Sequence, residues 1–305
     1  MKEKQNRSAP KIRTLLVTTS LLLLCGSMQL PCTFFMSTLK GVTYFGNNED
    51  FSDQRTNLWF VPSQEGKFGY VYFSYDNGWP QGGMNDRGLC FDGASTPKVN
   101  LKFSPEKKTY PGYLPDKIMG ECATVEDVLA VVREYRFGGL RGQGQLLFAD
   151  STGDAVILGG PDEKGDLDII RKDRDIMVLT NFFPNHPEKG GFPCLRYQSA
   201  TRQLEEAPQP SVDNFRHILE TVSSKYTQYS NVFDLNNRVI WLYHQRDFTK
   251  VVKLRLQDEL GKGPHAYRIH HLFREPREGE GLDEINRLRR EGRISRRIPR
   301  FIAYR

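Results

Sequence analysis

The chain has 305 residues and a net charge of +6, with 38% hydrophobic and 26% charged residues. This balance excludes a disordered or collagen-like chain, and the length allows one large domain or two small ones. The excess positive charge lies at the two ends, because residues 1–31 and 277–305 each carry +4 and the span 32–276 carries −2. The basic balance therefore gives no indication that the body of the chain binds nucleic acid.

The amino-terminal segment has the pattern of a targeting sequence. A basic stretch from Lys2 to Arg13 precedes an apolar run from Leu15 to Cys25. This run is shorter than the roughly 20 residues needed to span a bilayer. We therefore expect residues 1–31 to be a signal peptide or pre-peptide and the protein to be exported to the periplasm or the extracellular space. An uncleaved membrane anchor, or lipidation of Cys25, is the alternative.

From residue 32 onward, short strands separated by turn residues dominate the pattern. Turn residues include the Gly-Gly pair at 82–83 and the Asn-Asp-Arg-Gly segment at 85–88. A helix is predicted over 124–135, where Thr124 is a good N-cap and one apolar stripe follows it. Further helices are predicted over 196–204 and 214–225. The predicted strands cover 33–38, 42–45, 57–62, 69–73, 88–91, 146–150, 155–158, 176–181, 231–235, 239–243 and 250–256.

Strands, then helices, then strands again predict an α+β domain with antiparallel sheets covered by helices. We expect this domain to cover residues 32–260 and a basic tail to cover 261–305. The arginine-rich end of the tail is either a solvated segment or a patch that contacts a membrane or envelope surface. The sequence does not decide whether the protein is a homo-oligomer.

Several kinds of chemistry lack their usual motifs. The six histidines are scattered, without metal-ligand spacing, and phosphate-loop, dinucleotide and Gly-x-Ser-x-Gly patterns are missing. We therefore predict no metal and no cofactor.

Cysteine usage is more informative. Four cysteines follow residue 31, an even number that permits two disulfides in an exported protein. Cys32 differs from the others because it opens the first predicted strand just after the apolar segment, where processing can leave it as the first residue. The α-amino group of such a cysteine, with an ordinary pKa of about 7.7–8.0, can accept the thiol proton. A catalytic histidine is then not required.

Five motifs in order resemble the choloylglycine hydrolase and penicillin V acylase family of linear-amide hydrolases, within the N-terminal nucleophile superfamily. They are Pro-Cys-Thr-Phe-Phe at 31–35, Phe-Gly-Asn-Asn-Glu-Asp-Phe at 45–51, Gly-Gly-Met-Asn-Asp-Arg-Gly-Leu at 82–89, Val-Leu-Thr-Asn at 178–181 and Leu-Arg-Tyr at 195–197. Segment 229–235 is similar to the closing strands of the family. The resemblance implies an αββα sandwich of antiparallel sheets and hydrolysis of a small-molecule acyl amide.

The resemblance also implies roles for four residues. Cys32 matches the nucleophile that becomes the amino terminus, and Asp50 matches the carboxylate that holds its α-amino group. Asn181 matches the amide that binds the oxyanion, and Arg196 matches the guanidinium that braces the site. Without the resemblance, Asp50 could end a turn, Asn181 could cap a strand and Arg196 could be a surface cation.

Three further residues are predicted to contact substrate. The backbone donor of the oxyanion site is expected near Ser95. Asn47 stands where bile-salt hydrolases usually carry an arginine, which puts a bile-acid substrate in doubt, since a nearby cation lowers the pKa of a thiol. Either Arg196 or Arg55 compensates for this change, or the thiol is less activated.

The leading interpretation is an exported amidase that works through a thioester. The alternatives are acyl transfer to an amine, and a non-catalytic envelope protein in which Cys32 stays internal and pairs with another cysteine. The position before Cys32 is a poor signal-peptidase site, whereas a better one follows Ser27. We therefore predict export cleavage near Ser27, followed by autocatalytic removal of residues 28–31.

Overall fold

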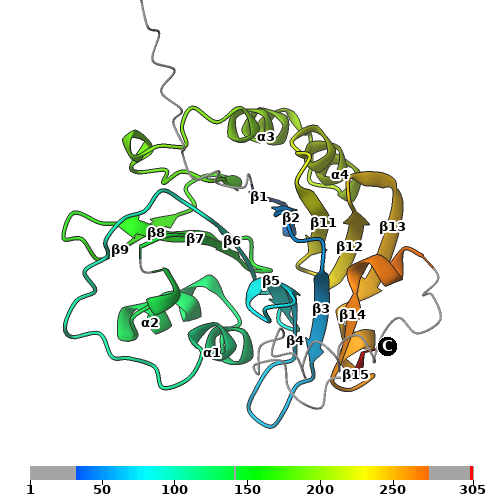
Figure 1. Cartoon of the computed structure of the whole chain (residues 1–305), viewed down its shortest axis with the longest axis horizontal. Helices are drawn as coiled ribbons and strands as arrows, with labels where there is room; N and C mark the ends of the chain where they lie inside the picture. Colours follow the sequence, from blue (N-terminus) through cyan, green and yellow to red (C-terminus); the bar gives the residue numbers. More distant parts are fainter. Residues whose placement is uncertain (1–31, 141, 275–302, 305) are drawn as a thin grey trace, which may run out of the picture.

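A computed structural model of the chain describes residues 32–140 and 142–274 and the backbone of 303–304 (Figure 1). The signal-peptide prediction lies outside these residues, as does the arginine-rich end of the tail. No helix among the described residues has the length and apolar character needed to cross a membrane.

Two sheets form the centre of the molecule. The first has six strands in the order β10-β1-β2-β11-β12-β13, all paired antiparallel. Its strands are β1 (Thr33–Leu39), β2 (Val42–Asp50), β10 (Ile176–Leu179), β11 (Thr227–Asp234), β12 (Val239–His244) and β13 (Asp247–Arg255).

The second sheet has nine strands in the order β15-β14-β3-β4-β5-β6-β7-β8-β9, antiparallel except for the pair β14–β15. Its strands are β3 (Thr56–Val61), β4 (Tyr70–Tyr75), β5 (Pro80–Asn85), β6 (Cys90–Ala94), β7 (Gln145–Ala149), β8 (Ala155–Pro161), β9 (Leu167–Arg171), β14 (His265–Arg268) and β15 (Ala303–Tyr304).

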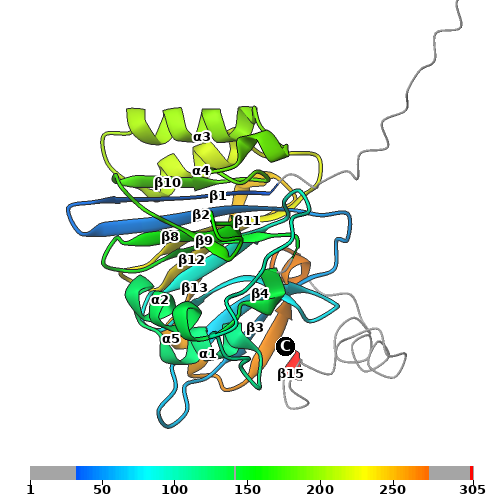
Figure 2. The same ribbon diagram turned by 90° about the vertical axis from the view of Figure 1, so that its left-hand side faces the viewer.

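Helices cover the outer face of each sheet, as Figures 1 and 2 show. Apolar side chains fill three cores, one between the sheets and one beneath each helical layer. The expected αββα arrangement is therefore confirmed. The helices are α1 (Leu114–Glu121) and α2 (Val125–Glu134) on the second sheet, α3 (Leu195–Glu206) and α4 (Val212–Thr221) on the first, and the short α5 (Leu256–Leu260) after β13.

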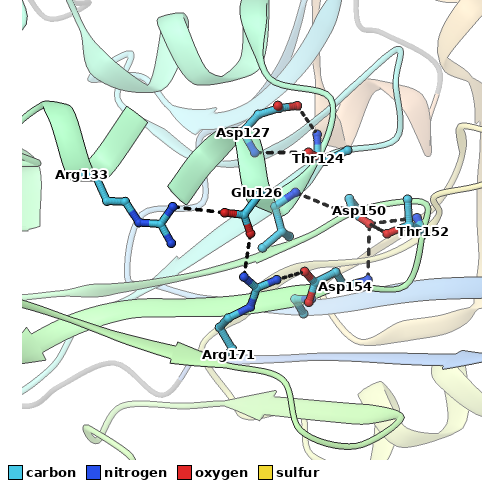
Figure 3. Close-up of polar contacts among 10 residues, drawn as sticks. Thr124, Glu126, Asp127, Arg133, Asp150, Thr152, Asp154 and Arg171 are labelled. Carbon is cyan, nitrogen blue, oxygen red and sulfur yellow. Dashed lines mark hydrogen bonds and ion pairs between the residues drawn. The ribbon is translucent and has the colours of Figure 1, made fainter. Parts of the chain in front are cut away.

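Helix α2 begins at a capping box in which Thr124 and Asp127 satisfy each other's backbone N–H groups. The carboxylate of Asp150, in the β7–β8 turn, accepts the Val125 N–H at 2.7 Å and so ties the helix to the sheet (Figure 3). The exposed ion pairs of Arg171 add little stability, because solvent screens them. Local sequence signals thus predict this helix correctly, and one buried carboxylate sets where it lies.

Two predictions from the sequence are wrong. Gly82 and Gly83, read as a turn, lie inside β5, where Cβ atoms would come within 2.4 Å of the Asp92 carboxylate and 2.3 Å of the Val71 carbonyl. The folded body also extends past the expected boundary at 260, because β14 pairs with β3 and the Arg268 side chain is buried in the sheet edge.

Candidate active site

The predicted nucleophile lies at one edge of the first sheet. Cys32 immediately precedes β1, and its side chain is only 6% exposed. The start of β1 lies beside the end of β2, since Thr33 is paired with Asn48. This register places the Cys32 Sγ atom 3.7 Å from the Asp50 carbonyl oxygen, although the two residues are 18 positions apart.

Arg196 connects three separate segments at this edge. It lies in the first turn of α3, and its Nη1 atom donates hydrogen bonds to the Cys32 carbonyl oxygen at 2.6 Å and to the Thr33 hydroxyl. Its Nη2 atom donates to the Asn181 Oδ1 atom at 3.0 Å. Arg196 thus does not lie free on the surface but joins Cys32, Thr33 and Asn181.

The same hydrogen bond orients the Asn181 side chain. Because Oδ1 faces Arg196, the amide nitrogen points the opposite way, and Nδ2 donates to the Ser95 carbonyl oxygen at 2.9 Å. Asn181 follows β10 in the first sheet, and Ser95 follows β6 in the second. The Asn181 amide therefore bridges the two sheets beside Cys32, and the predicted pair of Asn181 and Ser95 is brought together.

The Asp50 carboxylate is buried at the same place. The Thr227 hydroxyl donates to Oδ1, whereas Oδ2 has no hydrogen-bond partner among the described residues. Burial raises the pKa of Asp50 to about 6, although the Thr227 hydrogen bond, the Arg196 charge and the Ser224 side chain each lower it. A buried carboxylate oxygen without a donor is suited to hold a cation.

The environment of the thiol is acidic. Burial raises the pKa of Cys32 well above its ordinary value, and the charges of Glu49 and Asp50 raise it further. Arg55, one of the two predicted compensating cations, pairs with Asp53 at 2.6 Å and lies 3.7 Å from Asp76. Arg55 is thus engaged with carboxylates of its own, whereas Arg196 contacts the Cys32 carbonyl oxygen.

Asn47 does not take the place of the missing arginine. Its side chain is fully buried, and Nδ2 donates to the Asn231 Oδ1 atom at 3.1 Å. Asn47 and Asn231 thus form a buried, polar and uncharged pair across β2 and β11.

None of the four described cysteines forms a disulfide: Cys32, Cys90, Cys122 and Cys194 are all free and buried. The two disulfides permitted by the even count are therefore not formed. The alternative in which Cys32 pairs with another cysteine loses its support for the same reason. Among the described residues, no group of three His, Cys, Asp or Glu is placed to hold a metal ion.

Sequence reasoning missed four buried residues that face Cys32 from between the sheets. These are Glu49, Tyr75, Asp92 and Tyr229, and each is 3% exposed or less. The sequence could have indicated the position of Glu49. Side chains alternate along a strand, so Glu49 points to the opposite face of β2 from Asp50. Tyr75 and Asp92 come from the second sheet, and no local pattern indicates that they approach β1.

The raised pKa of Asp50 predicts a pH-dependent stability. The folded protein binds this proton more tightly than the unfolded chain does, so stability falls as the pH rises from about 4 through 6. In a Cys32→Ala background, Asp50→Asn should raise the free energy of unfolding by about 1–3 kcal/mol at pH 7.5 and leave it unchanged near pH 4. Urea denaturation at the two pH values measures this. An Asn variant that is less stable at pH 7.5 would contradict the prediction.

Comparison with known proteins supports the architecture. No model of a protein family matches the sequence, and no curated protein sequence matches it either. Solved structures do match. Penicillin V acylase from Agrobacterium tumefaciens has a TM-score of 0.54 at 16% identity, over 77% of this chain and 85% of its own. A mutant of conjugated bile acid hydrolase from Clostridium perfringens has a TM-score of 0.57 at 14% identity, over 78% and 96%. The chain shares the fold of these enzymes.

The Caenorhabditis elegans ortholog of N-acylethanolamine-hydrolyzing acid amidase also matches, with a TM-score of 0.50 at 14% identity, over 67% of this chain and 93% of its own. The fold implied by the family resemblance is thus confirmed. At these identities the similarity concerns the fold, and what the site does has to be inferred from its own residues.

Proposed function

We propose that this protein is an exported cysteine amidase of the N-terminal nucleophile type. The Cys32 thiolate attacks the carbonyl carbon of a linear amide, and the tetrahedral intermediate expels the amine to leave a thioester on Cys32. Water then attacks the thioester, releases the carboxylic acid and regenerates the thiol. The α-amino group of Cys32 accepts the proton in each attack and returns one to the leaving amine or thiol.

The hydrogen bonds of Arg196 carry this proposal. Arg196 contacts the backbone of Cys32 and the amide of Asn181, which come from segments far apart in the chain. Arg196 holds Oδ1 and so orients Nδ2 of Asn181, which carries two N–H groups: one donates to the Ser95 carbonyl oxygen, and the other can donate to an oxyanion. A preorganised donor of this kind typically contributes about 2.7–4 kcal/mol to catalysis.

In this proposal Asp50 holds the α-amino group, and two observations support that role. Its Oδ2 atom lacks a described partner, and its backbone carbonyl lies beside the Cys32 thiol. Once the peptide bond before Cys32 is cut, the new ammonium group can pair with this oxygen. The cation also lowers the pKa of the thiol, which offsets the acidic surroundings in the uncut chain.

The experiment that tests the proposal is amino-terminal analysis with intact-mass measurement of the exported protein, followed by assay against a panel of acyl amides. We expect a chain that begins at Cys32, carries a free thiol and releases amine from part of the panel. A chain with residues before Cys32 and full activity would overturn the mechanism. An acyl adduct that is stable in buffer but discharged by an added amine would indicate acyl transfer instead.

A further inference from the structure

Two carboxylic acids face the nucleophile from opposite sheets. Glu49, on β2, and Asp92, on β6, are 3% and 1% exposed, and the charge of each raises the pKa of the Cys32 thiol. Burial raises the pKa of Glu49, and the charge of Asp92 raises it further. In the second sheet Asp92 is paired with Gly82, and Gly82 is paired with Phe73, two positions from Tyr75 on β4. The Tyr75 hydroxyl donates to the Glu49 Oε1 atom at 2.8 Å and fixes that side chain.

The described residues supply no cation to this acidic pair. Neither Glu49 nor Asp92 takes part in an ion pair with a described Lys, Arg or His. The nearby arginines are engaged with other groups: Arg196 with Cys32, Thr33 and Asn181, Arg55 with Asp53 and Asp76, and Arg268 with Asp76. Buried carboxylates usually have a partner, because an unpaired buried charge is costly.

Unpartnered polar atoms lie on the same face. The Glu49 Oε2 atom is buried without a hydrogen-bond partner, and so is the Oδ1 atom of Asn47, two positions along β2. Leaving a buried acceptor unpaired is unfavourable, because the atom loses its hydrogen bonds to water and gains none in return. Together with the acidic pair, these acceptors are suited to a group that carries several donors and a positive charge.

The Asp92 side chain fits in the second sheet because the neighbouring residue on β5 is a glycine. A Cβ atom at position 82 would lie 2.4 Å from the Asp92 Oδ2 atom, so only glycine on β5 allows the carboxylate to sit there. The carboxylate also accepts the Gly93 N–H at 2.8 Å. Asp92 is therefore held in place by its own sheet rather than by a contact with Glu49.

We propose that Glu49 and Asp92 bind a cationic group of the substrate next to the scissile amide, so that the preferred substrates are amides bearing a primary ammonium or guanidinium group. This inference rests on the proposed function and specifies its substrate class. An anionic group at the same place would face two acids in a low-dielectric setting and would be rejected.

A charge series tests the proposal on the mature, full-length protein. On the amine side, the probes are N-octanoyl-1,2-diaminoethane, N-octanoyl-ethanolamine and N-octanoyl-taurine, which carry positive, neutral and negative groups. On the acyl side, they are the p-nitroanilides of β-alanine, propionic acid and succinic acid. We expect kcat/KM for the cationic member of at least one series to exceed the neutral member by about tenfold or more, and the anionic member to be the poorest.

Variants of the acidic pair then locate the effect. Glu49→Gln and Asp92→Asn should each reduce the cationic-to-neutral ratio of kcat/KM by about tenfold. Asp116→Asn is the matched control, because Asp116 also accepts a hydrogen bond from a tyrosine of β4, Tyr72, but on the outer face of the second sheet. This control should leave the ratio unchanged.

The results separate failure of this inference from failure of the proposed function. Hydrolysis with a neutral or anionic preference, or a cationic preference that survives in both variants, overturns the inference and leaves the amidase assignment in place. If no amide is hydrolysed, the proposed function fails, and calorimetric binding of the same probes decides the inference. Tighter binding of the cationic members supports it, and equal affinities overturn it. The comparison within the parent protein holds even if a variant does not fold.

Discussion

Cys32→Ala is expected to abolish turnover and to accumulate as a chain that begins near Met28. Alanine has no nucleophile for the substrate, and it also has no thiol to attack the carbonyl of Pro31 and release the amino group of residue 32. The fold should persist, because the substitution removes one sulfur atom at the start of β1. Amide release, intact mass and the thermal melting curve measure the three effects.

Two variants accompany this experiment. Cys32→Ser should keep at most a trace of activity, because a hydroxyl is a much weaker nucleophile at neutral pH. Cys122→Ala is the matched control, since Cys122 is also a free buried thiol but packs in the core beneath α1 and α2. It should mature and turn over normally. An alanine variant at position 32 that is trimmed to that residue would show that a separate protease makes the cut, and one that hydrolyses amides at the parent rate would refute the nucleophile.

Asn181→Ala should lower kcat by roughly 10²–10³ with little change in substrate binding, because it removes a donor that acts on the oxyanion. Arg196 would also lose the acceptor that it contacts at 3.0 Å. Steady-state kinetics on the best amide of the panel separates kcat from KM.

Asn185→Ala serves as the control for this substitution. Asn185 lies in the same loop and is exposed, with its amide bonded to Asp168 at 2.8 Å. Its kinetics should match those of the parent. A rise in KM alone for Asn181→Ala would remove Asn181 from the oxyanion role.

Local patterns in the sequence were sufficient to predict many of the helices and strands and the part of the site whose residues are close in the chain. The strands predicted at 33–38 and 42–45 are joined by a tight turn and indicate the hairpin that the structure contains. In the structure the second strand continues to Asp50, and this register brings Cys32 beside it. The Thr124 N-cap and the apolar stripe of α2 are also local features, and they predicted this helix. The resemblance of the later motifs to the family also predicted that Asn181 and Arg196 belong to the site.

The electrostatics around the thiol depend on how the two sheets pack against each other. Glu49 and Asp92 are far apart in sequence and belong to different sheets, so only the packing of one sheet on the other places both beside Cys32. Arg55 pairs with Asp53, two residues away, and lies near Asp76, which follows the neighbouring strand β4 of the same sheet. A pKa depends on burial and on every nearby charge, and neither is a property of a local segment; for this reason the acidic character of the site could not be read from the sequence.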